Sequence, residues 1–285
     1  MTNAIDLQNV TKRYPNGKGI SGVTLEVPAG QIFGFLGPNG AGKTTTIRTI
    51  MDFMRPDGGS ITVLGYDAQR ASVAVKERIG YVPADRQLYE SWTGRQHVDF
   101  YQSARPRSTS DVAKRLNLDL RIPVRQLSTG NKQKLAITLA MCGQPDLLIM
   151  DEPTAGLDPL LQQEIYAILE EYKKAGGTVF LSSHNLAEVE KTCDRVGVIK
   201  DGKVVANKSM DDMRDMSIHI VSITSDKPLH FKHKDVVVMH QTAVRTELKV
   251  KGSLNPLLAY LAKHNIKDLE INHASLEDVF MEYYS

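Results

Sequence analysis

A glycine-rich segment, GPNGAGKTT, occupies residues 37–45 and combines residue types that bind phosphate groups. Its glycines let backbone N–H groups approach an anion, and a helix predicted to begin at Gly42-Lys43-Thr44 adds the positive end of its dipole. Lys43 can reach the outer phosphates of a nucleotide, and Thr44 can offer a hydroxyl oxygen to Mg²⁺. The pattern G-x-x-x-x-G-K-[ST] therefore predicts a nucleotide-binding loop made of Gly37, Pro38, Asn39, Gly40, Ala41, Gly42, Lys43, Thr44 and Thr45.

A second segment, LLIMDEP at residues 147–153, places two carboxylates at the end of an apolar strand. Asp151 can hold Mg²⁺ through water, and Glu152 can orient or polarise the water that attacks a γ-phosphate. A purely regulatory nucleotide site would not need the second carboxylate. The alternative is a solvated turn after a core strand, but the upstream phosphate-binding loop favours hydrolysis.

The elements that must position these residues alternate between strands and helices. Strand-like runs (IDLQNV, VTLEV and QIFGFLG) precede the loop, and a helix follows it. The strand LLIMD, an amphipathic helix and the strand TVFLSSH come later, so we expect an α/β fold with a mostly parallel core sheet. Residues of about 86–145 lack strand runs and predict a helical insert.

The chain changes character after a predicted hairpin, VGVIKDGKVVA, with Asp201-Gly202 at its turn. The acidic run MDDMRDM follows, and we place a domain boundary near residue 210. Residues 1–210 then form the nucleotide-binding domain. Residues 211–285, with the runs IHIVSIT, VVVMH, VRTELKV, NPLLAYLAKHN and KDLEINH, form a small α+β domain without a recognisable catalytic motif.

The composition excludes several other classes of protein. The 285 residues are 41% hydrophobic and 24% charged, and a net charge of +2 provides no strong field toward nucleic acid. No stretch approaches the about 20 apolar residues needed to cross a bilayer, and the first residues do not resemble a secretory signal. Cys142 and Cys193 are predicted to be buried apolar residues, and the histidines after residue 218, such as His230 and His233, lack metal-ligand spacing.

Between the two nucleotide motifs, LSTGNKQKL at residues 127–135 resembles the LSGGQ signature of the ATP-binding-cassette (ABC) ATPases. Taken alone, Ser-Thr-Gly before a helix is usually an N-cap, but its place between the other motifs favours the signature. Thr129 replaces a glycine and Asn131 a glutamine. The resemblance covers roughly residues 4–208 and implies that the signature binds the ATP held by a partner subunit, through Ser128, Thr129, Gly130 and Asn131. It also implies the cassette architecture, in which an antiparallel β subdomain accompanies the core sheet and helical insert.

Other family positions correspond to single residues of this chain. Asp158, in AGLD, resembles the loop that crosses the dimer interface, and His184 matches the switch histidine that contacts the γ-phosphate and helps Glu152. Tyr14 occupies the place of an aromatic ring that stacks on adenine, although packing at a strand end is an equal alternative.

One departure concerns the strand IGYV, after which the family commonly carries a glutamine that contacts Mg²⁺ and couples the site to the membrane partner. Ala84 stands there, and Asp85 and Gln87 are candidates to substitute for it. The neighbouring LYESWTGRQHV resembles the stretch that docks a permease, while Trp92 is equally suited to packing within the insert.

The resemblance implies an ABC transporter ATPase subunit of the exporter type that hydrolyses ATP with Mg²⁺. Its partners would be a separate transmembrane permease and a second cassette, in a homodimer or heterodimer, and it would lie on the cytoplasmic side of the membrane. The ending SLEDVFMEYY is similar to carboxy-terminal helices of exporter ATPases. We expect no nucleic acid partner, and the alternatives are a soluble ABC-type ATPase acting on ribosomes or DNA and a nucleotide sensor with little turnover.

Overall fold

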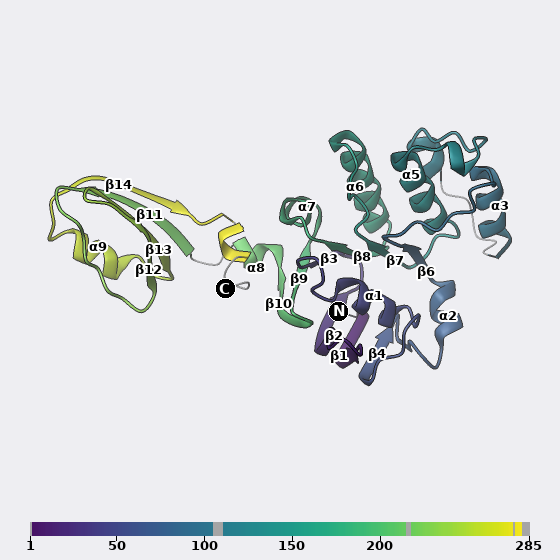
Figure 1. Ribbon diagram of the computed structural model, residues 1–285, viewed down its shortest axis with the longest axis horizontal. Coiled ribbons are helices and arrows are strands. Elements are labelled where there is room, and N and C mark those ends of the chain that lie inside the picture. The colour runs from purple at the N-terminus through teal and green to yellow at the C-terminus, as the bar shows by residue number, and fades with distance from the viewer. Residues whose placement is uncertain (1, 105–110, 215–217, 276, 281–285) are drawn as a thin grey trace. The chain divides into compact units, whose positions relative to one another are not determined.

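The computed structural model describes residues 2–104, 111–214, 218–275 and 277–280. The chain divides into two compact units, residues 1–210 and residues 211–285 (Figure 1). In its described residues, the first unit contains two sheets with surrounding helices. The second contains one four-stranded sheet, most of α8 (Met210–Arg214), the helix α9 (Asn255–Leu261) and the helical residues 277–280.

The core sheet of the first unit has six strands in the order β10-β9-β3-β8-β7-β6. All neighbouring strands are parallel except β10, which runs antiparallel to β9. Every residue of β3, β7 and β8 is buried, as expected for parallel strands covered on both faces. The predicted α/β fold with a mostly parallel sheet is confirmed. The strands are β3 (Ile32–Leu36), β6 (Ile79–Val82), β7 (Leu147–Asp151), β8 (Thr178–Ser183), β9 (Arg195–Lys200) and β10 (Lys203–Ser209).

An antiparallel sheet in the order β2-β1-β4-β5 shares one hydrophobic core with the core sheet. Leu7 and Val23 of this sheet belong to the same buried cluster as Phe33 and Phe180, whose rings stack at 5.7 Å. Helix α1 (Lys43–Ile50) contributes Ile47 to that cluster. The strands are β1 (Asn3–Arg13), β2 (Gly19–Pro28), β4 (Gly58–Val63) and β5 (Tyr66–Asp67).

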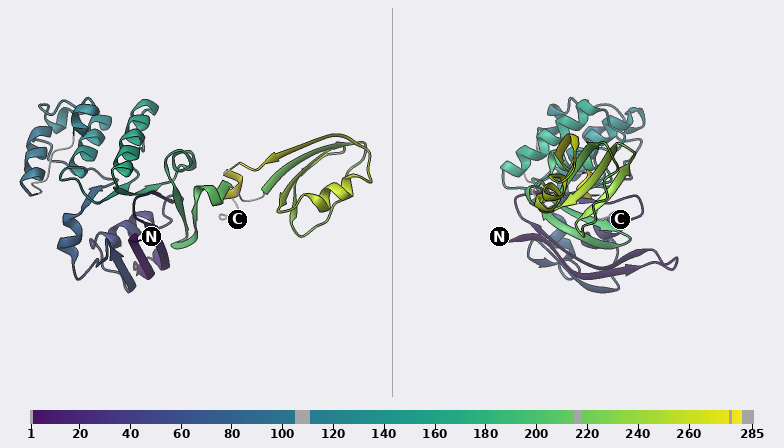
Figure 2. Two further views of the ribbon diagram at one scale, coloured as in Figure 1. Left: turned by 180° about the vertical axis from the view of Figure 1, so that it is seen from behind. Right: turned by 90° about the vertical axis from the view of Figure 1, so that its left-hand side faces the viewer.

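Helices cover both faces of the core sheet. Figures 1 and 2 show α5, α6 and α7 on one face and α1 with the antiparallel sheet on the other. The predicted helical insert contains α3, α4, η1 and α5 around a small core that includes Val124 and Leu135. The short helices α2 and α8 were not expected from the sequence. The remaining helices are α2 (Ser72–Glu77), α3 (Gly94–Ala104), α4 (Val112–Arg115), η1 (Val124–Gln126), α5 (Thr129–Ala140), α6 (Pro159–Lys174), α7 (Leu186–Thr192) and α8 (Met210–Arg214).

The predicted hairpin joins β9 to β10. Asp201 and Gly202 both have positive φ, +48° and +75°, which a two-residue type I′ turn requires. The hairpin prediction is confirmed, and the turn chemistry explains why the sequence revealed it.

The second unit is an antiparallel sheet in the order β12-β13-β11-β14, with α9 packed on one face. Leu257 and Leu261 of α9 contact a cluster that includes Val221, Ile223 and Leu248. The five predicted elements are present; of the predicted closing helix, residues 277–280 are helical and the rest lies outside the described residues. The strands are β11 (Ile218–Ser225), β12 (Val236–Gln241), β13 (Arg245–Lys251) and β14 (Ile266–His273).

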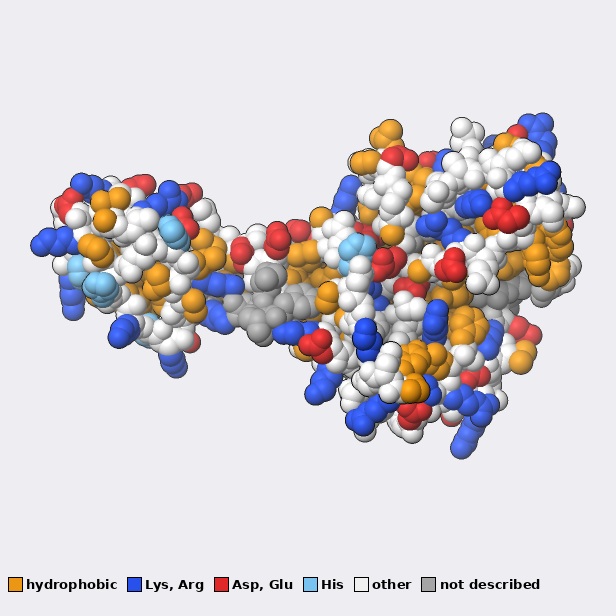
Figure 3. All heavy atoms as spheres, viewed as in Figure 1, with side chains coloured by type: hydrophobic (Ala, Val, Ile, Leu, Met, Phe, Trp, Pro, Cys, Tyr) orange, Lys and Arg blue, Asp and Glu red, His pale blue; other side chains and the backbone are white. Residues whose placement is uncertain are grey.

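The surface carries charges of both signs. Figure 3 shows Lys and Arg side chains interspersed with Asp and Glu on the visible face of the first unit. Among the helices that the structure describes, none combines the length and apolar character needed to cross a membrane.

His219 and His273 form a cross-strand pair in the second unit, with ring centroids 4.9 Å apart. Burial and the charge of protonated His273 lower the pKa of His219. The folded state disfavours the charged imidazole, so His219 contributes to the free energy of unfolding above its ordinary pKa. This contribution is lost as the pH falls from the ordinary pKa through the lowered pKa of the folded state. We expect His273→Asn to raise the pKa of His219, measured by an NMR titration of its imidazole resonances; an unchanged pKa would show that His273 has no influence.

Candidate functional site

The glycine-rich loop runs from the end of β3 to the start of α1. The Gly37 N–H donates to the Ser183 carbonyl oxygen at 3.2 Å, and a Cβ at Gly37 would lie 2.6 Å from the Ile199 carbonyl oxygen. Gly42 has a φ of +110°, which L side chains rarely adopt. Glycine is therefore required at both positions, and the loop presents the N-terminus of α1 at its open side.

Lys43 is the first residue of α1, and its ammonium group is buried within the loop. Its Nζ donates to the carbonyl oxygens of Gly37, at 2.7 Å, and Pro38, at 3.2 Å. The same atom lies 3.2 Å from Oε1 of Glu152. The ammonium group of Lys43 thus connects the glycine-rich loop to the carboxylate of Glu152, which directly follows β7.

Asp151 and Thr44 meet where β7 ends against α1. The Thr44 hydroxyl donates to Oδ2 of Asp151 at 2.9 Å, and the Ser182 hydroxyl donates to Oδ1 at 2.5 Å. A hydroxyl and a carboxylate are the hard oxygen donors that Mg²⁺ prefers, and Mg²⁺ usually takes only one or two ligands from protein. The two residues therefore fit a Mg²⁺ site that water and phosphate oxygens would complete.

Glu152 follows Asp151 in a backbone conformation that is uncommon for a residue with a side chain, with a φ of +50°. Its N–H donates to the Ser182 hydroxyl at 3.0 Å and to the Ser182 carbonyl oxygen at 3.2 Å. Oε2 of Glu152 lies 2.9 Å from Nδ1 of His184. Strained backbone of this kind clusters at functional sites, and here it turns the carboxylate between Lys43 and His184.

A cavity of about 420 Å³ lies over the loop and receives Glu152 on one side. Tyr14 forms part of its wall, and the Tyr14 hydroxyl contacts Met54 Sδ at 3.2 Å and Thr45 Oγ1 at 3.4 Å. Three polar residues that were not predicted from the sequence also line it. Their positive or polar side chains near the loop were the available signal: Asn16, Lys18 and Arg48.

The signature residues line a separate cavity, of about 260 Å³. Ser128 caps α5 by accepting from the Asn131 N–H at 3.3 Å, and Asp158 caps α6 by accepting from the Leu161 N–H at 2.9 Å. Gly130 also lines this cavity, whereas Thr129 is an exposed residue in the first turn of α5. Within one chain, these residues and Lys43 therefore line different cavities.

Asp85 and Gln87, the two candidates to replace the family glutamine, lie in the loop after β6. This loop does not bring them to the nucleotide cavity, the 420 Å³ cavity over the glycine-rich loop. Asp85 and Gln87 are exposed, as is Ala84, and none of the three is among the described residues that line that cavity. Instead, Nε of Arg86 donates to Oε1 of the buried Gln133 on α5. Gln133 Nε2 in turn donates at 2.5 Å to the carbonyl oxygen of Pro153, next to Glu152.

This link was missed from the sequence. Gln133 lies three and four residues before the buried Ala136 and Ile137, so a polar side chain on the apolar face of α5 was the available signal.

Trp92 lies in an aromatic cluster at the edge of the helical insert. Its ring is 4.7 Å from Tyr89 and 5.8 Å from Phe100, between centroids, and both neighbours are exposed. Trp92 therefore packs within the insert and also borders an exposed aromatic surface.

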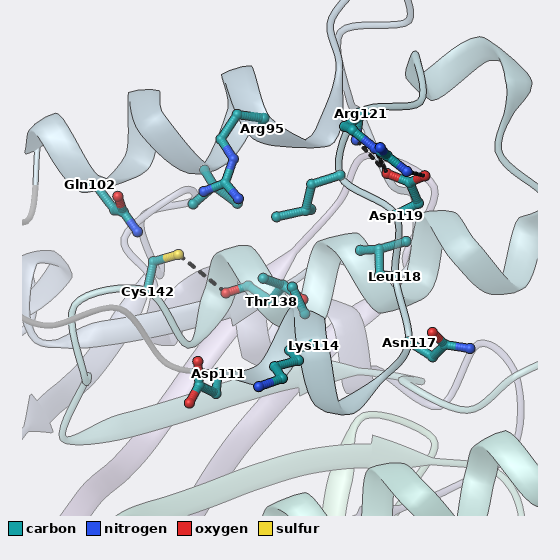
Figure 4. A pocket seen from close by; sticks show the side chains of 13 residues that line it. Arg95, Gln102, Asp111, Lys114, Asn117, Leu118, Asp119, Arg121, Thr138 and Cys142 are labelled. Atoms are coloured by element: carbon teal, nitrogen blue, oxygen red, sulfur yellow. Dashed lines mark hydrogen bonds and ion pairs between the residues drawn. The ribbon is translucent and has the colours of Figure 1, made fainter.

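Another cavity, of about 680 Å³, lies elsewhere in the insert (Figure 4). Its charged side chains include Arg121, which forms an ion pair with Asp119 at 2.8 Å, and Cys142 donates to the Thr138 carbonyl oxygen. This cavity contains none of the residues predicted to bind nucleotide.

Comparisons with known proteins agree on one family. Residues 20–155 match the model of the "ABC transporter" family. The chain is 30% identical to an uncharacterised ABC transporter ATP-binding protein, YcbN of Bacillus subtilis (strain 168), across 99% of this chain and 97% of that protein. It is also 30% identical to the Nod factor export ATP-binding protein I of Cupriavidus metallidurans, with the same coverage. A solved ATP-binding subunit of an ABC transporter, 31% identical, superposes with a TM-score of 0.70 over 75% of this chain and 92% of that one.

Ser182 should stabilise the site because its buried hydroxyl serves both Asp151 and the Glu152 N–H. We expect Ser182→Ala to lower the free energy of unfolding by about 1–3 kcal/mol, the usual effect of leaving a buried hydrogen-bonding group unpaired. Urea unfolding followed by circular dichroism measures this, with the exposed Ser60→Ala as the control. Equal free energies of unfolding for the two variants would contradict a stabilising role of the Ser182 hydroxyl.

Proposed function

The chain belongs to the ABC transporter ATP-binding protein family, and from this premise we propose that it hydrolyses Mg-ATP to drive a separate membrane permease of an exporter. The position of Glu152 carries the proposal. Its carboxylate lies between Lys43 Nζ and His184 Nδ1, at 3.2 and 2.9 Å. A carboxylate held beside Lys43, the residue proposed to bind the γ-phosphate, can orient and deprotonate an attacking water. Nucleotide binding alone does not require this role.

The cavity over the glycine-rich loop would receive ATP. Backbone N–H groups of the loop and the N-terminus of α1 would bind the phosphates, with Lys43 on the outer ones and Tyr14 beside the base. Thr44 and Asp151 would hold Mg²⁺, which when bound neutralises charge on the phosphates. His184 would keep Glu152 oriented and contact the γ-phosphate.

Two separate cavities favour a head-to-tail pair of cassettes. Ser128, Gly130, Asn131 and Asp158 line one cavity, and the nucleotide loop lines the other, so one chain cannot place both around a single ATP without a rearrangement. In the proposed pair, each ATP lies between the loop of one cassette and the signature of the other. The second cassette is another copy of this chain or a related one.

Export is supported by the relative named for Nod factor export, which matches this chain along nearly its whole length. The exposed aromatic cluster around Trp92 is the proposed contact with the permease, and this contact would hold the chain at the cytoplasmic face of the membrane. ATP-driven closing of the cassette pair would then change the state of the permease.

We expect Glu152→Gln to bind ATP while losing at least about 100-fold in hydrolysis rate, because the amide cannot accept the proton of water. The hydrolysis rate is measured as phosphate release. The variant should also accumulate as an ATP-bound dimer, detected by gel filtration with Mg-ATP. The exposed Glu77→Gln is the matched control. Hydrolysis by Glu152→Gln at the parent rate would remove Glu152 from its catalytic role.

The partner is tested by tagging the chain in its native cell, extracting membranes in mild detergent and identifying co-purifying proteins. We expect to recover an integral membrane protein in stoichiometric amount. Its recovery should fall with Phe100→Ser, which removes an exposed ring of the aromatic cluster. Recovery should not fall with the control Val73→Ser, which introduces the same polar side chain at an exposed apolar residue of α2. ATPase activity of the isolated variants should be unchanged. Recovery only in the soluble fraction, with ribosomes, DNA or no partner, would contradict a transport function.

A further inference from the structure

Glu188 is a buried carboxylate that no step of the proposed hydrolysis uses. It lies in the first turn of α7 with only 6% of its surface exposed. Its Oε1 accepts a short hydrogen bond from the Thr154 hydroxyl and its Oε2 accepts one from the Ser183 hydroxyl, each at 2.5 Å. Both donors are themselves buried.

Each donor belongs to a segment of the proposed catalytic site. Ser183 ends β8 immediately before His184, and its carbonyl oxygen accepts from the Gly37 N–H. Thr154 comes two residues after Glu152, and its carbonyl oxygen accepts from the Leu157 N–H in the segment that leads to Asp158. The Glu188 carboxylate therefore joins the end of β8, next to His184, to the segment that runs from Glu152 to Asp158.

The surroundings show why a charged group at this place must be fully hydrogen-bonded. Burial raises the pKa of Glu188, the hydroxyls of Ser183 and Thr154 lower it, and the charge of Glu152 raises it again. Tyr166 of α6 lies close by, and burial together with the Glu188 charge raises the pKa of Tyr166 to about 12. An acceptor in this position is costly unless both hydroxyls remain paired with it, so the two segments are held in a fixed relation.

The imidazole of His184 is half exposed. Glu152, Ser183, His184 and Glu188 line a common cavity of about 160 Å³, which leaves room for the imidazole to turn away. The bond from His184 to Glu152 crosses between the same two segments that Glu188 joins.

We propose that Glu188 is a positioning residue for ATP hydrolysis: through Ser183 and Thr154, it holds His184 and Glu152 in their productive arrangement and transmits movement of the Asp158 segment to them. This inference rests on the proposed function. Glu188 lies behind the reacting groups and is not expected to touch ATP, so it acts on turnover and not on nucleotide affinity.

The test compares Glu188→Gln with Glu190→Gln, the same substitution at an exposed residue of the same helix. We expect Glu188→Gln to lower kcat by about 10-fold to 100-fold, with little change in KM for ATP, since one of the two accepting oxygens becomes an NH₂ group that cannot accept from a hydroxyl. Equilibrium titration with a fluorescent ATP analogue should give equal affinities for the two variants. Glu190→Gln should match the parent chain in both measurements.

A double-mutant cycle separates positioning from general destabilisation. Ser183→Ala and Thr154→Val each remove one donor and should lower kcat in the same way, and they keep the test available if Glu188→Gln does not fold. Combining Glu188→Gln with Ser183→Ala should reduce kcat no further than the more severe single change, because both break one interaction.

A parent-like kcat in Glu188→Gln, a loss confined to ATP binding, or multiplicative losses in the double variant would each overturn the inference. Absence of hydrolysis in both the parent chain and Glu190→Gln would instead overturn the proposed function, and with it this inference.

Discussion

The parallel pairing of β3, β8 and β7 is the constraint on which the site depends. Its register places Leu36 opposite Ser183, and Ser182 opposite Asp151. The phosphate-binding loop, Glu152 and His184 come directly after these strands, and Asp151 is the last residue of β7. Side chains more than 100 residues apart therefore converge at one edge of the sheet, as the bond between Thr44 and Asp151 shows. Carboxyl ends of parallel strands are where such folds place their ligands.

Buried polar groups make that edge specific. Asp151, Lys43, Ser182, Ser183 and Glu188 are all buried, and each has hydrogen-bond partners that offset the cost of leaving water. Ser182 is central because one hydroxyl supports Asp151 and also the strained backbone of Glu152. The site is thus preorganised by β8, a strand that the nucleotide motifs themselves do not include.

The arrangement also divides the proposed work between two chains. The cavity over the glycine-rich loop holds the groups proposed to bind ATP and to activate water, while the cavity lined by Ser128 and Asp158 is not lined by Lys43. At the loop after β6, Ala84 is exposed, and Arg86 with Gln133 connects that loop to the carbonyl oxygen next to Glu152. Arg86 and Gln133 therefore connect the loop after β6 to the segment that carries Glu152.

The sequence by itself determined most of the elements, the short helices α2 and α8 excepted, and the local chemistry. Glycine spacing, the carboxylate pair after an apolar strand and the Asp201-Gly202 turn depend on neighbours in the chain, so they could be interpreted without a structure. Tertiary structure decided what depends on pairing between distant segments: the contact of Glu152 with Lys43 and His184, the roles of Ser182 and Glu188, and the link through Gln133. A buried polar side chain is given its partner by strand register and helix packing, and neither is encoded in the spacing of residues along one segment.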